Sequence, residues 1–166
     1  FDLAIRGGHL ADSSMIARKI ASWRYVLVAA PAWIEAHGPM EDPSEVADHW
    51  VLYSDVARAR HWAFERDQTS LALEVRPVLT VRDGFMMRAA LRAGVGVSAM
   101  PPYLVEEDLD RGTLAQVLPA WRVAHVLPIW AVRPHRNFVP ARVQAVLDVV
   151  EARLGIEEKR WTQRFG

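Results

Sequence analysis

The sequence predicts an α/β fold, and the stretch from Val78 to Pro102 supplies the main evidence for it. Residues 78–81 form a short β-branched run, residues 85–93 have the spacing of an amphipathic helix, and residues 95–100 are small and apolar throughout. A strand that is apolar on both faces is typical of a parallel sheet with helices on both sides. We therefore expect a strand–helix–strand unit whose two strands are parallel.

The helix of this unit has recognisable end signals. Asp83 is expected to be its N-cap, and Gly94 is expected to end it in the left-handed conformation that glycine adopts at little cost. Five apolar residues recur at helical spacing, whereas two arginines, four positions apart, fall on another face. The apolar residues are Phe85, Met86, Ala89, Ala90 and Ala93, and the arginines are Arg88 and Arg92.

A ligand site is expected where the two strands end. In open parallel sheets, ligands bind outside the carboxyl ends of the strands, and we expect the two ends to be adjacent, with Arg82 and Asp83 beside Met100 and Pro101. Pro102 suits a first helical position, so two helix N-termini and an arginine would face a bound anion. The equally open alternative is that Asp83 only caps its helix and that Arg82 is a solvated surface charge.

The remaining elements follow from periodicity and from proline and glycine signals. Strands are expected at residues 3–5, 16–20, 24–29, 50–53, 61–65, 71–75, 114–118 and 129–132, with the first of them buried, and helices at 32–37, 43–48, 103–109 and 140–154. Gly155 should end the last helix and leave residues 155–166 as a frayed tail.

The loop Arg6, Gly7 and Gly8 follows the first expected strand. It is a third strand end that could face a ligand, because two glycines allow close approach of a backbone. A plain turn explains the same residues at least as well.

Composition excludes several classes of function. The 166 residues include 20 basic and 20 acidic side chains, so a nucleic-acid-binding face is not expected in this segment. There is no cysteine, the six histidines have no metal-ligand spacing, and no nucleophile or phosphate-binding motif occurs. No apolar run reaches the roughly 20 residues of a membrane span. We expect a cytoplasmic protein that is not an enzyme and needs no cofactor or metal.

Several ordered motifs resemble the effector-binding domain of LysR-type transcriptional regulators over residues 1–154. They include FDLAIRGG, VLVAAPAWIEAHG, AGVGVSAMPPYLVEEDLDRGTLAQVLP and WAVRPHRNFVPARVQAVLDVV. The resemblance implies a type 2 periplasmic-binding-protein-like fold, in which two α/β subdomains are joined by two crossing strands and the effector binds in the cleft. Residues 1–24 and 124–154 would form subdomain I, residues 25–123 subdomain II, and residues 155–166 a C-terminal tail. Subdomain I is expected to be incomplete, because the family's first strand, helix and strand precede the matching motifs.

The resemblance also implies a function and partners. The chain would be the effector-sensing regulatory domain of a DNA-binding transcription factor, forming a homodimer or homotetramer and reaching DNA only through an N-terminal winged helix-turn-helix. Arg6, Gly7 and Gly8 would line the effector site from subdomain I, and Arg82, Asp83, Met100 and Pro101 from subdomain II. Arg82 replaces a residue that is commonly small and polar, so the effector is a small organic anion or the arginine partly fills the pocket. No membrane partner is expected. An exported solute-binding protein of the same fold is the alternative.

Overall fold

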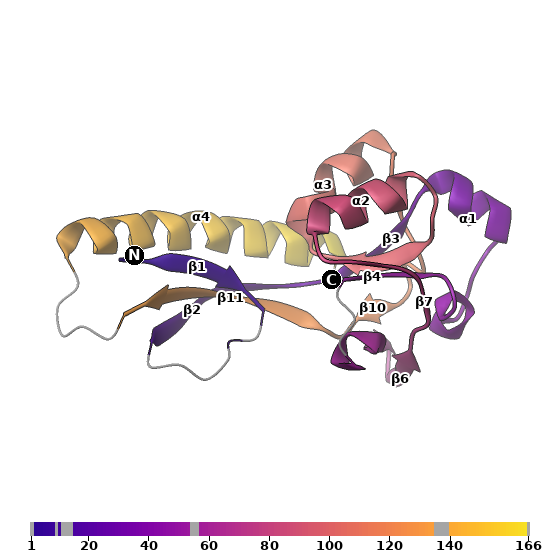
Figure 1. Ribbon diagram of the computed structural model, residues 1–166, viewed down its shortest axis with the longest axis horizontal. Coiled ribbons are helices and arrows are strands. Elements are labelled where there is room, and N and C mark those ends of the chain that lie inside the picture. The colour runs from indigo at the N-terminus through magenta and orange to yellow at the C-terminus, as the bar shows by residue number, and fades with distance from the viewer. Residues whose placement is uncertain (1, 9, 11–14, 54–56, 135–139, 166) are drawn as a thin grey trace. The chain divides into compact units, whose positions relative to one another are not determined.

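The computed structural model describes residues 2–8, 10, 15–53, 57–134 and 140–165 (Figure 1). The chain divides into two compact units: unit 1 is Phe1–Arg24 with Val126–Gly166, and unit 2 is Tyr25–His125. The chain therefore passes between the units twice, after Arg24 and after His125. None of the described helices is both long and apolar enough to cross a membrane.

Unit 1 is a three-stranded antiparallel sheet with one long helix. The strands β1 (Ala4–Gly7), β11 (Val126–Arg133) and β2 (Ile16–Arg24) lie in the order β1-β11-β2, and the helix α4 (Ala141–Phe165) packs along β2. Among the described residues β1 is an edge strand, and its Ile5 is exposed, so the prediction of a buried first strand is wrong.

The helix α4 does not end at Gly155, and the predicted frayed tail is helical through Phe165. Trp161 is only 5 % exposed and packs edge-on against Trp23, with 5.0 Å between the ring centroids. Glu158 accepts hydrogen bonds from the backbone N–H of Ser22, at 3.0 Å, and from its hydroxyl, at 2.8 Å. These contacts with β2 outweigh the low helix propensity of one glycine, which costs about 1 kcal/mol.

Replacing Gly155 with alanine should raise the free energy of unfolding by about 0.5–1 kcal/mol, because Gly155 lies inside a helix. A Cβ placed there would meet no atom within 4 Å. Urea denaturation measures the change. Gly94→Ala is the matched control and should destabilise, because Gly94 has a φ of 74° that alanine rarely adopts. An unchanged free energy for Gly155→Ala would contradict a continuous helix.

Unit 2 is built on a five-stranded mixed sheet. Its order is β7 (Pro77–Val81), β4 (Trp50–Tyr53), β8 (Val97–Met100), β3 (Val26–Ala29) and β9 (Ala115–Gln116). β4 is parallel to β7 and β8, and β3 is antiparallel to β8 and β9. The predicted parallel direction of β7 and β8 is confirmed, but their predicted adjacency is wrong because β4 lies between them. Gly96 permits this order, since a Cβ there would lie 2.2 Å from the carbonyl oxygen of His49, just before β4.

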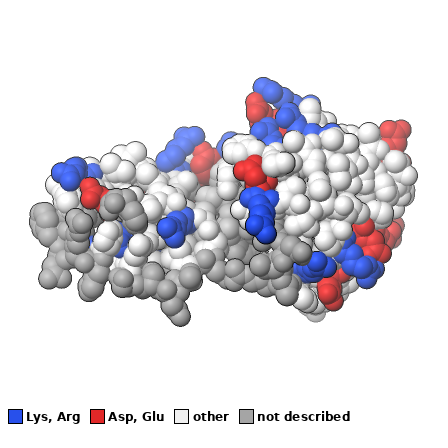
Figure 2. Space-filling model, in the orientation of Figure 1, with Lys and Arg blue, Asp and Glu red and all other residues white. Residues whose placement is uncertain are grey.

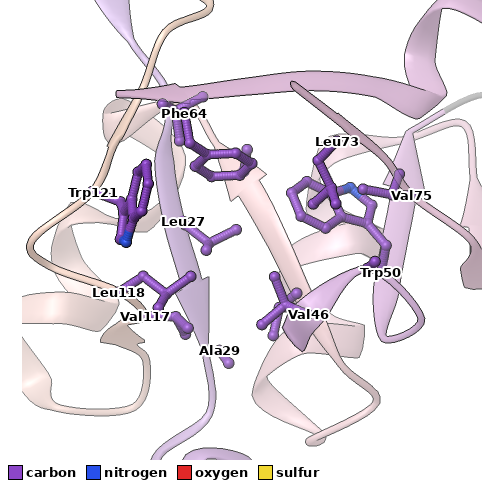
Figure 3. Close-up of a cluster of buried hydrophobic side chains, with 14 of the residues drawn as sticks. Leu27, Ala29, Val46, Trp50, Phe64, Leu73, Val75, Val117, Leu118 and Trp121 are labelled. Carbon is purple, nitrogen blue, oxygen red and sulfur yellow. The ribbon is translucent and has the colours of Figure 1, made fainter. Parts of the chain in front are cut away.

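One face of this sheet carries the main hydrophobic core (Figure 3). It is covered by α1 (Pro31–His37), the short 3-10 helix η1 (Pro43–Val46) and the antiparallel sheet of β5 (His61–Arg66), β6 (Thr69–Glu74) and β10 (Arg122–Val123). A second 3-10 helix, η2 (Ala57–Arg60), precedes β5. Trp50 and Phe64 are the largest side chains with no exposed surface, so this core anchors β4 and β5 together.

Two helices, α2 (Gly84–Arg92) and α3 (Pro102–Arg111), contact each other in unit 2 and lie side by side in Figure 1. The predicted helix and its end signals are confirmed, but the predicted apolar face is not the buried one. Met87 and Leu91 are buried, whereas Phe85 is 68 % and Met86 63 % exposed. The reason lies in α3, where buried Asp108 pairs with both arginines of α2 and turns their face inward.

Candidate functional site

The candidate site is the edge of the unit 2 sheet at which its three parallel strands end. Arg82 follows β7, Tyr53 is the last residue of β4, and Pro101 follows β8. The register pairs Tyr53 with Val81, so Tyr53 lies next to Arg82 and between the two strand ends that the sequence identified. We call these residues, together with the first turns of α2 and α3, the carboxyl edge.

The N-terminus of α2 is capped by the chain itself. One carboxylate oxygen of Asp83 accepts hydrogen bonds from the backbone N–H groups of Phe85 and Met86, both at 2.9 Å. The prediction that Asp83 is an N-cap is confirmed. Two N–H groups that could bind an anion are therefore already engaged by a carboxylate.

The N-terminus of α3 differs from that of α2. Its N-cap is Pro101, Pro102 opens the helix, and no side chain among the described residues caps it. A Cβ at Gly84 would lie 2.9 Å from Cδ1 of Leu104, so the first turns of α2 and α3 are in contact. The positive end of the α3 dipole thus lies at the carboxyl edge, and no carboxylate among the described residues caps it.

Arg82 and Met100 have different surroundings. The Arg82 side chain is exposed and forms no ion pair with any residue that the structure describes, Asp83 included. Met100 has no exposed surface, so its side chain belongs to the core, and Pro101 is half-buried. Of the residues predicted in unit 2, Arg82 is the one whose charged side chain is available to a ligand.

The three tyrosines of the chain gather at this edge, which the sequence reasoning missed. Tyr53 pairs with Val81, Tyr25 precedes Val26, which pairs with Met100, and Tyr103 lies in the first turn of α3, so the register places all three at the carboxyl edge. Burial raises the pKa of Tyr25 to about 12 and also raises the pKa of Tyr103. The signal was present in the sequence, because Tyr53 ends a predicted strand and Tyr103 follows Pro101 and Pro102. It could not be used without knowing that β4 lies beside β7 and β8.

The residues predicted in unit 1 form a turn. Arg6 is exposed on β1, opposite Trp130 of β11, and Gly7 ends the strand. The N–H of Gly8 donates to the carbonyl of Pro128 at 2.9 Å, and its own carbonyl accepts from the indole N–H of Trp130 at 2.8 Å. With a φ of 91°, Gly8 serves the turn that was the alternative reading.

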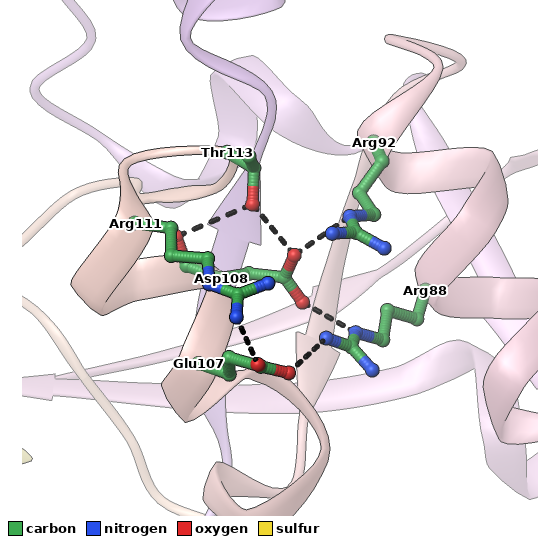
Figure 4. A network of polar contacts seen from close by, with 6 residues as sticks. All are labelled: Arg88, Arg92, Glu107, Asp108, Arg111 and Thr113. Carbon is green, nitrogen blue, oxygen red and sulfur yellow. Dashed lines mark hydrogen bonds and ion pairs between the residues drawn. The ribbon is translucent and has the colours of Figure 1, made fainter.

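A buried ionic network joins the two helices of the carboxyl edge (Figure 4). Asp108 of α3 has no exposed surface and pairs with the Nε atoms of Arg88 and Arg92 of α2, the latter at 2.7 Å. The hydroxyl of Thr113 donates to the same carboxylate at 2.6 Å. Glu107, which is exposed, lies 3.4 Å from a guanidinium nitrogen of Arg88 and 2.7 Å from one of Arg111.

The protonation of Asp108 follows from these contacts. Burial by itself would raise its pKa, but the Thr113 hydroxyl and the guanidinium groups of Arg88 and Arg92 outweigh burial and hold the pKa below its usual range. The ionised carboxylate therefore fixes α2 against α3 at neutral pH.

Charges of both signs are mixed on the face that Figure 2 displays. Basic and acidic side chains are interspersed there, in keeping with 20 of each in the sequence, whereas nucleic acid is bound by a predominantly basic face. Within the described residues, no three histidine, aspartate or glutamate side chains are grouped so that they could hold a metal ion.

Comparison with curated proteins identifies relatives along nearly the whole chain. The HTH-type transcriptional regulator PtxR of Pseudomonas aeruginosa is 30 % identical over 163 residues, which cover 98 % of this chain and 52 % of PtxR. The HTH-type transcriptional activator AaeR of Escherichia coli is 26 % identical over 148 residues, covering 89 % of this chain and 48 % of AaeR. The chain thus spans about half the length of these curated relatives.

Solved structures agree with these relatives. The regulatory domain of CrgA, a LysR-type transcriptional regulator from Neisseria meningitidis, matches with a TM-score of 0.77 and 27 % identity over 92 % of this chain and 75 % of that one. A full-length AphB variant matches with a TM-score of 0.73 and 28 % identity over 91 % of this chain and 51 % of that one. The predicted periplasmic-binding-protein-like α/β fold is confirmed. The family profile described as the LysR substrate binding domain matches residues 1–155, and the chain belongs to this family.

Proposed function

We propose that this chain is the effector-sensing part of a LysR-type transcriptional regulator and that the carboxyl edge of unit 2 contacts the effector. The observation that carries the proposal is the position of Arg82. Its guanidinium is exposed, has no ion-pair partner among the described residues, and follows a central strand where α2 and α3 begin. Parallel sheets bind ligands at such strand ends.

The charge of the carboxyl edge favours a small organic anion. A guanidinium–carboxylate contact contributes roughly 1.5–3 kcal/mol, and a helix N-terminus such as that of α3 adds about 0.3–1 kcal/mol. Asp83 is the opposing charge nearby, but its carboxylate is engaged by two backbone N–H groups of α2. The same proposal includes Arg6, Gly7, Gly8 and the backbone of Met100 and Pro101 as further effector contacts, as the family resemblance implies.

The rest of the whole-protein function belongs to the same proposal. The relatives are named as transcriptional regulators, which supports sensing rather than catalysis and gives no support to an exported solute-binding protein. We infer that the complete protein binds DNA through a winged helix-turn-helix, works in the cytoplasm, and assembles as a homodimer or homotetramer. The exposed edge of β1 is consistent with association between copies, because unpaired strand edges tend to pair.

Replacing Arg82 with alanine should weaken effector binding by about 10- to 100-fold, which corresponds to the loss of one bidentate contact. Arg82→Lys should lose less, because lysine keeps the charge but not the planar fork. The measurement is calorimetric titration of the intact-length regulator with an inducer found by screening organic acids. Arg111→Ala is the control, since Arg111 is an exposed arginine at the other end of α3 and pairs with Glu107. An affinity within about twofold of the starting protein would show that Arg82 is a surface charge.

A further inference from the structure

We infer that the effector carries an aromatic ring, held against Tyr53 and Tyr103, beside the acid group that Arg82 receives. This inference rests on the proposed function, since it concerns the same carboxyl edge. The proposed function concerns only the charge of the effector, whereas this inference concerns the organic group that carries the charge.

Large apolar and aromatic side chains are exposed at the carboxyl edge from three separate segments of the chain. Tyr53 ends β4 and is 54 % exposed, and Tyr103 in the first turn of α3 is 52 % exposed. Phe85 and Met86 in the first turn of α2 are exposed further still. Exposed apolar side chains that cluster in this way mark binding surfaces more often than isolated ones do.

The segments that carry these side chains end or begin at the same sheet edge as Arg82. Tyr53 pairs in register with Val81, the residue before Arg82. β4 also neighbours β8, which leads through Pro101 into the first turn of α3, where Tyr103 lies. The contact between Gly84 and Leu104 brings the first turn of α2 against that of α3. A flat ligand at this edge would therefore meet a cation and phenol rings together.

A third tyrosine at this edge is anchored in the core. Tyr25 precedes Val26, which pairs with Met100, and its ring packs edge-on against Trp62, with 5.4 Å between the centroids at 85°. Trp62 contacts Trp50 at 5.4 Å and His125 at 4.9 Å. Trp50 has no exposed surface. This packing fixes the Tyr25 ring, so that side chain loses little freedom when a ligand binds beside it.

The phenols also fit an acidic aromatic ligand chemically. Each phenol ring has an electron-rich face and a positive edge, so it can pack face to face or edge-on with an aromatic ring of a ligand. An interface to a second copy of the chain would explain exposed Phe85 and Met86, but it would not explain the arginine among the tyrosines. A ligand with both a ring and an acid uses all of these groups.

The test compares two acids of equal charge and similar size, one aromatic and one not, on the whole 166-residue chain. Titration with benzoate and with cyclohexanecarboxylate, followed by NMR, should give on the order of tenfold tighter binding of benzoate. Tyr53→Leu and Tyr103→Leu should remove this preference, because leucine offers an aromatic ring and a saturated ring the same apolar contact. Tyr103→Phe keeps the ring and should retain the preference, which separates loss of stacking from misfolding.

The outcomes separate this inference from the proposed function. Equal binding of the two acids, weakened by Arg82→Gln, would overturn the aromatic inference and leave the anion site standing. Benzoate binding that is unaffected by Arg82→Gln and equalled by neutral benzamide would support the ring contact and refute the proposed anion contact. If neither acid saturates the chain by about 10 mM, the inference is overturned. If Phe85→Ser also abolishes self-association in that case, the exposed side chains serve an interface between copies of the chain.

Discussion

Replacing Asp108 with asparagine should lower the free energy of unfolding by about 3–5 kcal/mol, the usual cost of removing one partner from a buried ion pair. Asp108 has no exposed surface, and its carboxylate holds two arginines of α2 and the hydroxyl of Thr113. Asparagine keeps the shape but leaves the largely buried guanidinium of Arg88 without its countercharge. Urea denaturation followed by circular dichroism measures the loss.

Glu107→Gln is the matched control for this prediction. Glu107 precedes Asp108 on the same helix and also pairs with Arg88, but its side chain is exposed. Exposed ion pairs contribute roughly 0–1 kcal/mol, so the control should change the free energy of unfolding little. The double change Asp108→Leu with Arg88→Met should recover part of the loss, because both charges leave together. Equal effects of Asp108→Asn and Glu107→Gln would refute a structural role for the buried pair.

The same carboxylate predicts how stability depends on pH. The pKa of Asp108 is lower in the folded chain than its usual value of roughly 3.9 in an unfolded one, so the unfolded state binds more protons as the pH falls. Its contribution is therefore complete above the unfolded pKa and is lost as the pH falls through the folded pKa. Acid titration should consequently destabilise the starting protein more than Asp108→Asn.

Local signals explain why the helices of unit 2 could be located from the sequence. Asp83 caps α2, Gly94 and Gly112 follow their helices with positive φ, and Asp42 caps the 3-10 helix η1. Each signal involves residues within a few positions of one another, so a single sequence contains all the information that it needs. Arg82 was identified for the same reason, because a strand end next to a cap is a local pattern.

Contacts between distant residues explain what could not be predicted. The face of α2 is decided by Asp108, which belongs to α3, the next helix along the chain, and has no counterpart in the periodicity of α2. The order β7-β4-β8 depends on Gly96 lying against the carbonyl of His49. The tyrosines at the carboxyl edge were missed because of the strand order, since Tyr53 joins the candidate site only when β4 lies between β7 and β8.

The extension of α4 is the third such case, and it yields the second large prediction. Trp161→Ala should lower the free energy of unfolding by about 3–5 kcal/mol, as large-to-small changes of buried tryptophans do. The lost contact is the edge-on packing against Trp23, which is itself buried on β2. Because the indole N–H of Trp161 is buried with no hydrogen-bond acceptor among the described residues, the cost should fall at the lower end of this range.

Two further variants of α4 make this expectation specific. Trp161→Phe keeps an aromatic ring against Trp23 and removes the unsatisfied N–H, so it should cost less than about 1.5 kcal/mol. Ile156→Ala removes an exposed apolar side chain from the same helical segment and should stay within about 0.5 kcal/mol. A frayed tail would make all three variants alike, whereas a helix docked through Trp161 predicts a clear loss for Trp161→Ala alone, because only that change leaves a cavity beside Trp23.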